Sequence, residues 1–232
     1  MKILAIGAHP DDLEIFAYGT LAAWRAMGAE LVLAVATDGA KGGAMAPDAL
    51  RALRAAETTS ALAPVGVPRL LGFADGELRA DAALEGALRD LVAEVGPDLL
   101  VTHAPNDYHA DHRALSLAAS QAAGYSVPVL WMDTLNGTGF APSHWVDVTG
   151  HWAAKERAIR AHVTQDPERF VQMANRQAAF RAGECNARPE ARAEAFRFEP
   201  RFPFADIRAL LPPAPALQPI GACTSPAPAR TA

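Results

Sequence analysis

The chain opens with MKILAIGAHPDDLEIFAYGTLAAWRAMG, residues 1–28. Ile3 to Gly7 is a short apolar run that ends in a turn, which is typical of a buried parallel strand. From Asp12 to Met27, apolar side chains recur at the three- and four-residue spacing of one helix, and Gly28 follows as its expected end. The stretch therefore predicts a strand, a tight turn and a helix, which is the first unit of an α/β fold.

The same alternation continues along the chain. Further strands are expected at 31–36, 69–72, 98–102, 127–132 and 145–148, and further helices at 48–62, 81–95, 111–123, 152–163 and 167–182. Strands that alternate with helices favour a parallel sheet with helices on both faces. We therefore predict an α/β, Rossmann-like three-layer sandwich with a mostly parallel sheet. Its active site is expected at the carboxyl edge of the strands, where open α/β sheets bind ligands.

Composition limits the classes of function. The 232 residues are 50% hydrophobic and 20% charged, as expected of one globular domain, predicted at 1–211. A net charge of −5 provides no basic field for nucleic acid. With two cysteines, Cys185 and Cys223, and no run of about 18 apolar residues, we expect no disulfide framework, no membrane span and a cytoplasmic location. Residues 212–232, which are rich in Pro and Ala, are predicted to form an irregular tail.

The first polar motif is His9-Pro10-Asp11-Asp12, at the end of the first strand. A dinucleotide-binding protein would have a glycine fingerprint here, and two carboxylates would repel a pyrophosphate. An imidazole and a carboxylate can instead converge on a divalent cation, with a second carboxylate left over. The alternative is that Asp12 caps the helix and Asp11 interacts with its dipole.

The second polar motif, residues 102–112, also follows a strand and precedes a helix. It holds His103, His109, Asp111 and His112, so it adds three imidazoles to the same sheet edge. One imidazole can bind metal while another faces the reacting group, and a carboxylate can orient a ring. Three protein ligands with one position open are typical of a catalytic metal site, whereas a structural site has four.

These two motifs, about a hundred residues apart, resemble those of the PIG-L/LmbE family of zinc-dependent N-deacetylases. The similarity covers roughly residues 1 to 200, and the loop 37–43 departs from it, since Ala40-Lys41 stands where many members have Gly-Glu. Further segments agree with the family pattern: Leu71 to Glu77, Arg54 with Glu57, Val146 to Thr149, Lys155, His162, Gln165 and Glu194-Ala195-Phe196.

The resemblance implies that His9, Asp12 and His112 bind the metal. The family metal is zinc, although two imidazoles and a carboxylate also accept Fe²⁺, Mn²⁺ or Co²⁺. It also implies small-molecule substrates, namely N-acylated amino-sugar conjugates, and a possible homo-oligomer.

The resemblance further implies that Asp11 is the general base and that His109 stabilises the oxyanion. Zinc lowers the pKa of a bound water towards about 7, so a nearby carboxylate can take its proton. Asp111 is expected to hold the His109 ring and favour its protonated form. The proton for the leaving amine comes from Asp11 or from His109, and the sequence leaves both open.

Four residues are weaker candidates for binding substrate. Arg54 is expected either to bind substrate or order a loop, or else to form a plain surface ion pair with Glu57. Asp38 and Lys41 lie on the glycine-rich loop at the ligand-binding edge, where loops tend to determine specificity. His103 is expected either to support the metal site from behind or to contact substrate.

The leading hypothesis is a metal-dependent hydrolase that removes an N-acyl group, most simply acetyl, from an amino-sugar conjugate. A second hypothesis keeps the metal but changes the bond, as in a thiol-conjugate amidase or an esterase. A third is a non-catalytic domain that binds metal or sugar. Asp11 discriminates the enzyme hypotheses from the third, because a pure binding site has no need of a carboxylate beside its water.

Overall fold

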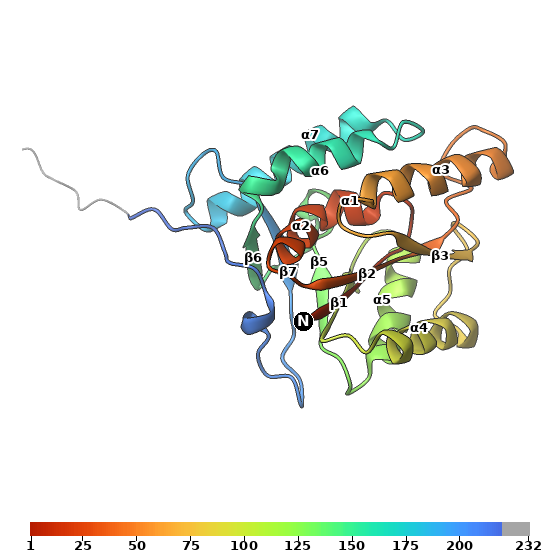
Figure 1. Cartoon of the computed structure of the whole chain (residues 1–232), viewed down its shortest axis with the longest axis horizontal. Helices are drawn as coiled ribbons and strands as arrows, with labels where there is room; N and C mark the ends of the chain where they lie inside the picture. Colours follow the sequence, from red (N-terminus) through yellow and green to blue (C-terminus); the bar gives the residue numbers. More distant parts are fainter. Residues whose placement is uncertain (220–232) are drawn as a thin grey trace, which may run out of the picture.

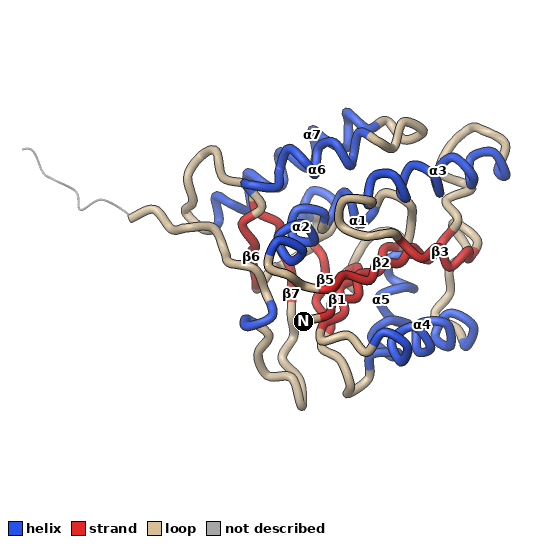
Figure 2. Tube along the Cα trace, in the orientation of Figure 1, coloured by secondary structure: helices blue, strands red, loops and turns tan. Residues whose placement is uncertain are grey.

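The computed structural model describes residues 1–219 (Figures 1 and 2). One sheet has the order β3-β2-β1-β4-β5-β7-β6; β1 to β5 are parallel, and β7 is antiparallel to β5 and β6. The strands are β1 (Lys2–Gly7), β2 (Glu30–Thr37), β3 (Pro68–Phe73), β4 (Leu99–His103), β5 (Val129–Met132), β6 (His144–Asp147) and β7 (Ala193–Arg197). The α-helices are α1 (Asp12–Phe16), α2 (Tyr18–Ala26), α3 (Pro47–Leu62), α4 (Ala82–Val95), α5 (Ala110–Ala123), α6 (Trp152–Arg160) and α7 (Pro167–Glu184). Short 3₁₀ turns are η1 (Leu135–Gly137), η2 (Thr149–His151) and η3 (Arg208–Leu210).

Helices cover both faces of the sheet. α4 and α5 pack on one face, and α1, α2, α3, α6 and α7 lie on the other (Figure 1). Each face has its own buried apolar cluster, because the central strands are apolar on both sides. The predicted three-layer α/β fold with a mostly parallel sheet is confirmed.

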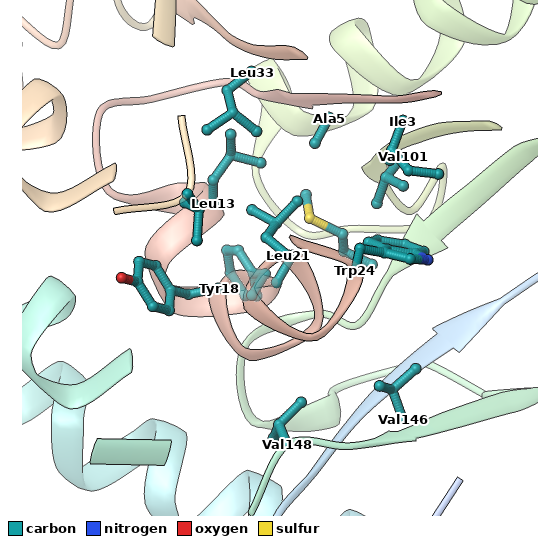
Figure 3. Packing of buried hydrophobic residues seen from close by; sticks show 14 of the residues in the cluster. Ile3, Ala5, Leu13, Tyr18, Leu21, Trp24, Leu33, Val101, Val146 and Val148 are labelled. Atoms are coloured by element: carbon teal, nitrogen blue, oxygen red, sulfur yellow. The ribbon is translucent and has the colours of Figure 1, made fainter. Parts of the chain in front are cut away.

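The larger cluster fixes the first strand and its helices in place. Ile3 on β1, Leu21 and Trp24 on α2 and Val101 on β4 are completely buried in it (Figure 3). Trp24 also donates its indole N–H to the carbonyl of Leu210, 2.7 Å away. Fully burying one such large side chain stabilises a fold by about 1.5–3 kcal/mol.

The predicted single helix from Asp12 to Met27 is wrong, because the chain breaks at Ala17 (φ −138°) into α1 and α2. The cause is a distant carboxylate. Glu194, on β7, accepts the backbone N–H groups of Gly19 at 2.9 Å and Thr20 at 2.8 Å. Those donors lie in the first turn of α2, where backbone N–H groups have no partner within the helix. Glu194 therefore caps the second helix from outside it.

Replacing Lys155 with methionine is expected to destabilise the protein by about 3–5 kcal/mol. Lys155 Nζ lies 2.6 Å from Glu194 Oε1, and both side chains are buried. The variant would leave the carboxylate without a counter-charge in the protein interior. Urea unfolding checks this, with Arg69→Ala as the control, because the Arg69–Glu94 pair is exposed to solvent. A midpoint for the methionine variant equal to the control's would contradict the argument.

The described part of the tail runs along the β6 side without regular structure. Asp147 donates its backbone N–H to the carbonyl of Pro213 at 2.9 Å, and Gln218 to that of Asn186 at 3.0 Å. Residues 220–232, which include Cys223, lie outside the described part, and the division into 1–211 and 212–232 stays a prediction. Within residues 1–219, no helix combines the length and the apolar character that crossing a membrane requires.

Candidate active site

The two polar motifs meet because their strands are neighbours. β1 and β4 pair in parallel, so their carboxyl ends lie at the same edge of the sheet. His9 and Asp12 follow β1, and His112 lies in the first turn of α5, after β4. All three side chains are buried, with exposed fractions of 8% or less. The predicted meeting of the two motifs at the carboxyl edge is therefore observed.

Donor atoms of these three residues lie close together. His9 Nδ1 lies 3.2 Å from His112 Nε2. His112 Nε2 lies 3.4 Å from Asp12 Oδ1, and His9 Nδ1 lies 3.4 Å from the other carboxylate oxygen, Asp12 Oδ2. Donors placed 2.0–2.1 Å from a tetrahedral ion are about 3.3–3.4 Å apart, by the geometry of a tetrahedron. The nitrogen and oxygen atoms of this His/Asp cluster are therefore close enough together to hold a metal ion.

Carboxylates face the remaining ring nitrogen of each histidine. His9 Nε2 lies 3.2 Å from Asp111 Oδ2 and 3.3 Å from Asp75 Oδ1. His112 Nδ1 lies 3.1 Å from Asp107 Oδ2. Metal-binding histidines generally hold their other ring nitrogen against a carboxylate or carbonyl, which fixes the tautomer and the ring orientation. With a cation bound, these contacts would leave His9 Nδ1 and His112 Nε2 as the nitrogens that face it.

The carboxylate of Asp12 contacts the ring of His103. Asp12 Oδ2 lies 3.0 Å from His103 Nε2 and accepts the backbone N–H of His9 at 2.6 Å. His103 is completely buried, so it lies behind the ligands and is not exposed to a bound substrate. Of the two predicted roles for His103, the geometry supports the one in which it orients a metal ligand.

The electrostatics of this cluster favour positive charge at its centre. Burial opposes protonation of His9, yet hydrogen bonds to Asp111 and Asp12 outweigh it and raise the pKa of His9 to about 12. Burial likewise opposes charge on His112, but Asp12 and other carboxylate contacts raise its pKa to about 9. The carboxyl of Asp12 is buried too, and His112 and His103 hold its pKa well below the usual value. A divalent cation bound between these groups satisfies the same carboxylates.

The expected contact between Asp111 and the His109 ring is wrong. The Asp111 carboxylate contacts His9 and accepts the backbone N–H groups of Gly76 at 2.7 Å and Leu78 at 3.3 Å. His109 caps α5: its Nδ1 accepts the backbone N–H of Asp111 at 3.2 Å. Burial and the nearby His112 and His9 lower the pKa of His109, opposite to the expected direction.

Because Asp111 contacts His9, Asp111→Asn is expected to weaken metal binding about 10- to 100-fold. If Asp111 instead acted through His109, the variant would lose turnover with unchanged metal affinity. Competition with a chromophoric chelator separates the two outcomes, and His109→Gln provides the comparison. An unchanged metal affinity in Asp111→Asn would restore the original assignment.

Asp11 has a strained backbone beside the ligands. Its φ is 129°, in a region that residues other than glycine rarely adopt, and such strain is concentrated at functional sites. It occupies the position before α1 without a capping hydrogen bond from its side chain. The carboxylate of Asp12 bonds the N–H of His9, outside the helix. The alternative interpretation in which the side chain of Asp12 caps the helix is therefore wrong.

Arg54, on α3, connects Asp11 to the glycine-rich loop at residues 37–43. Its guanidinium donates to Asp11 Oδ2 at 3.1 Å, to the carbonyl of Pro10 at 2.7 Å and to that of Gly39 at 3.1 Å. Burial raises the pKa of Asp11 to about 6, while the charge of Arg54 acts in the opposite direction. Arg54 is 3% exposed, so the interpretation as a surface ion pair is wrong. The predicted loop-ordering role agrees with these contacts.

Gly42→Ala is expected to lower kcat by about 10- to 100-fold, the range caused by misplacing a catalytic group by about 1 Å. A Cβ at Gly42 would overlap Arg54 Nη1, so the guanidinium that holds Asp11 has to move. Gly86→Ala on α4, where a Cβ meets no atom within 4 Å, is the control. Equal kcat values for the two variants would contradict this role of Arg54.

The remaining weak candidates differ in position. Asp38 is not among the residues that line the cavity: its carboxylate accepts hydrogen bonds from Arg51 Nε at 2.8 Å and from the backbone N–H groups of Ala40 at 3.0 Å and Asp75 at 3.3 Å. Lys41 lies at the cavity mouth, where its Nζ is 2.5 Å from Glu77 Oε1. The structure therefore places Lys41, and not Asp38, where a substrate can reach it.

The cluster of proposed metal ligands (His9, Asp12 and His112), here called the ligand cluster, opens into a cavity of about 330 Å³. Asp11, His109 and Arg54 all line it, so the proposed base and oxyanion donor face the same space as the metal ligands. The other lining residues are His9, Asp12, Ile15, Phe16, Lys41, Gly42, Asp75, Gly76, Tyr108, His112, Leu135 and Phe170.

Sequence reasoning missed the roles of Asp75 and Asp107, which contact His9 and His112 respectively. Asp75 lies in the segment Leu71 to Glu77, which agrees with the family pattern, and Asp107 lies in the polar motif at residues 102–112. Metal-binding histidines generally place their second ring nitrogen against a carboxylate or carbonyl, and that rule could have identified Asp75 and Asp107 as candidates.

Comparisons with known proteins agree with this geometry. The family model described as PIG-L, GlcNAc-PI de-N-acetylase, matches residues 4–123. The 1D-myo-inositol 2-acetamido-2-deoxy-alpha-D-glucopyranoside deacetylase of Mycolicibacterium smegmatis is 32% identical over 232 residues, covering 71% of this chain and 80% of that protein.

Two solved structures show the same fold. The N,N'-diacetylchitobiose deacetylase of Pyrococcus horikoshii has a TM-score of 0.77 and 24% identity, over 85% of this chain and 83% of that one. The 4-carboxy-2-hydroxymuconate hydratase of Pseudomonas putida KT2440 has a TM-score of 0.75 and 23% identity, over 86% and 97%. At these identities the likeness concerns the fold alone, and one fold serves two kinds of reaction.

Proposed function

Because the chain belongs to the PIG-L family of GlcNAc-PI de-N-acetylases, we propose that it is a metal-dependent hydrolase that removes an N-acetyl group from an amino-sugar conjugate. The observation that carries this proposal is the close grouping of His9, Asp12 and His112 donor atoms in the cavity that the carboxylate of Asp11 also lines. Three ligands with an open position and an adjacent base are what metal-assisted amide hydrolysis requires.

The proposed ligands are His9 Nδ1, His112 Nε2 and one carboxylate oxygen of Asp12. We propose Zn²⁺ as the ion, since two imidazoles and a carboxylate in a tetrahedral arrangement suit it, with Fe²⁺, Mn²⁺ and Co²⁺ as alternatives. When bound, such a cation supplies Lewis acidity, which polarises a carbonyl and lowers the pKa of water.

Asp11 is proposed as the general base. Arg54 holds its Oδ2, so Oδ1 is the oxygen that can accept a proton from the water that attacks the amide carbonyl. The same carboxyl group can then return this proton to the departing amine, which must leave as a neutral molecule.

His109 is proposed to stabilise the oxyanion as a neutral imidazole. Its Nδ1 accepts the backbone N–H of Asp111, so the ring proton is carried on Nε2. His109 lines the cavity beside the metal ligands, where Nε2–H can donate to the tetrahedral oxyanion. With His109 neutral, Asp11 is the proposed source of the proton for the leaving amine.

The experiment that tests the function is a screen of the purified, metal-loaded protein against N-acetylglucosamine conjugates, with detection of free amine. The panel includes an inositol glycoside, diacetylchitobiose and a thiol conjugate, and the chelator-treated protein is the control. We expect amine release from at least one conjugate and none after chelation. Absence of release from all of them would favour the other amidase or the non-catalytic hypothesis.

The proposed partner is a small-molecule substrate. The M. smegmatis and P. horikoshii proteins are named for N-acetylated sugar compounds, and the cavity of about 330 Å³ suits a ligand of that class. The cytoplasmic location and the homo-oligomer remain predictions.

A further inference from the structure

The cavity has an apolar side that neither the metal ligands nor Asp11 uses. Ile15 and Phe16 on α1 form its inner part, three and four residues after the ligand Asp12 and thus on the same helix face. Leu135 in η1 and Phe170 near the start of α7 continue it outward, and both are half-buried. α7 packs against both η1 and α1, so the four side chains come from adjoining elements.

The polar and the apolar lining residues contact different histidines of the site. His9 faces Asp75 through Nε2, at 3.3 Å, and faces His112 through Nδ1. The His112 ring in turn lies against the Phe16 ring, with centroids 6.1 Å apart. The polar residue Asp75 thus contacts one of the two histidines and the apolar Phe16 contacts the other.

The polar wall suits the sugar. It presents Arg54, Asp75 and, at the mouth, Lys41 with Glu77. Sugar hydroxyls lose their hydrogen bonds to water on binding and need polar partners, which the apolar wall does not supply. When the amide carbonyl is at the metal position, the amine and acyl parts of the substrate extend to opposite sides. The acyl part then meets Phe16.

We propose that the apolar side, formed by Ile15, Phe16, Leu135 and Phe170, is an acyl-binding site that takes straight aliphatic chains longer than acetyl. The proposal rests on the proposed function. An acetyl methyl group next to Phe16 is too short to reach Leu135 and Phe170, which extend the wall towards the mouth. Each additional methylene buried there adds about 0.8 kcal/mol, or nearly fourfold in kcat/KM.

A chain-length series tests the site. The metal-loaded enzyme is assayed with N-acetyl-, N-butyryl- and N-hexanoylglucosamine, and free glucosamine is measured. We expect kcat/KM to rise by about tenfold from acetyl to butyryl, because two methylenes are buried. A butyryl value equal to or below the acetyl value overturns the proposal. Failure to cleave any of the three amides contradicts the proposed function itself, so the two failures are distinguishable.

A matched pair of variants on α7 tests which wall is involved. Phe170→Ala removes a side chain that lines the cavity, whereas Phe180→Ala removes an exposed one (62%) from the same helix. We expect the hexanoyl-to-acetyl ratio of kcat/KM to fall about tenfold in Phe170→Ala and to stay at the wild-type value in Phe180→Ala. The ratio is independent of metal content and of the fraction of folded protein. An unchanged ratio in Phe170→Ala overturns the assignment.

Discussion

Asp11→Ala is expected to keep the metal and to lower kcat about 10²- to 10⁴-fold, the range contributed by a positioned general base. The three proposed ligand atoms belong to other residues, so the metal content should equal that of the wild-type protein. The loss should be in kcat, since the proton transfer takes place in the transition state. Metal analysis of the purified variant and steady-state release of amine check both parts.

A second variant separates chemistry from backbone strain. The φ of 129° at Asp11 suits glycine, so Asp11→Gly relieves strain that Asp11→Ala retains. We expect Asp11→Gly to be at least as resistant to urea as Asp11→Ala and equally inactive. Asp90→Ala, an exposed aspartate on α4, is the control for assay and purification. Turnover near the wild-type rate in either Asp11 variant would remove Asp11 as the base.

The meeting of His9, Asp12 and His112 was predictable from sequence because it follows from topology. Parallel strands bring their carboxyl ends to one edge, and each of the two motifs follows such a strand. The pattern of apolar runs identified those strands without knowledge of their order in the sheet. Local sequence and one general rule were therefore sufficient for this part of the site.

The partners of these residues depend on loops, and local sequence does not determine them. Asp111 lies beside His109 in sequence, which suggested that they interact. In the fold, the backbone N–H groups of Gly76 and Leu78 and the ring of His9 surround its carboxylate. These contacts of Asp111 depend on the path of residues 74–78, and no periodicity in the sequence predicts that path.

The break between α1 and α2 has a similar origin. Residues 12–27 have the periodicity of one helix, and no helix-breaking residue stands at Ala17. The carboxylate that caps α2 comes from Glu194, more than 170 residues further along the chain. That strand was itself missed as an element, although Glu194-Ala195-Phe196 was noted as a motif. β7 has only five residues, and so short a strand has a weak sequence signal.

The fold alone does not select the reaction. A structure named as a hydratase matches this chain with nearly the same TM-score as a chitobiose deacetylase. The argument for amide hydrolysis therefore rests on the site and on the family match over residues 4–123. Within the site, the apolar side is the feature that most directly concerns substrate choice, and the chain-length series addresses it.

His112→Ala is expected to weaken metal binding by more than about 100-fold. Removing a residue that only orients a ligand already costs 10- to 100-fold, and His112 supplies one of three proposed donor atoms. The remaining pair, His9 and Asp12, provides only two of the three proposed ligands. Asp107→Asn, which changes only the carboxylate that faces His112 Nδ1, should give a smaller loss, within 10- to 100-fold.

The graded order of these losses is the discriminating result. Chelator competition gives the affinity of each variant, and metal analysis after desalting gives its occupancy. His144→Ala, on β6 and outside the cavity, is the matched histidine control and should bind metal as the wild type does. If His112 is a ligand, its loss exceeds that of Asp107→Asn, because a missing donor atom costs more than a misoriented one. Full occupancy with unchanged affinity in His112→Ala would exclude it from the ligand set and, with it, the tetrahedral arrangement on which the proposed hydrolysis depends.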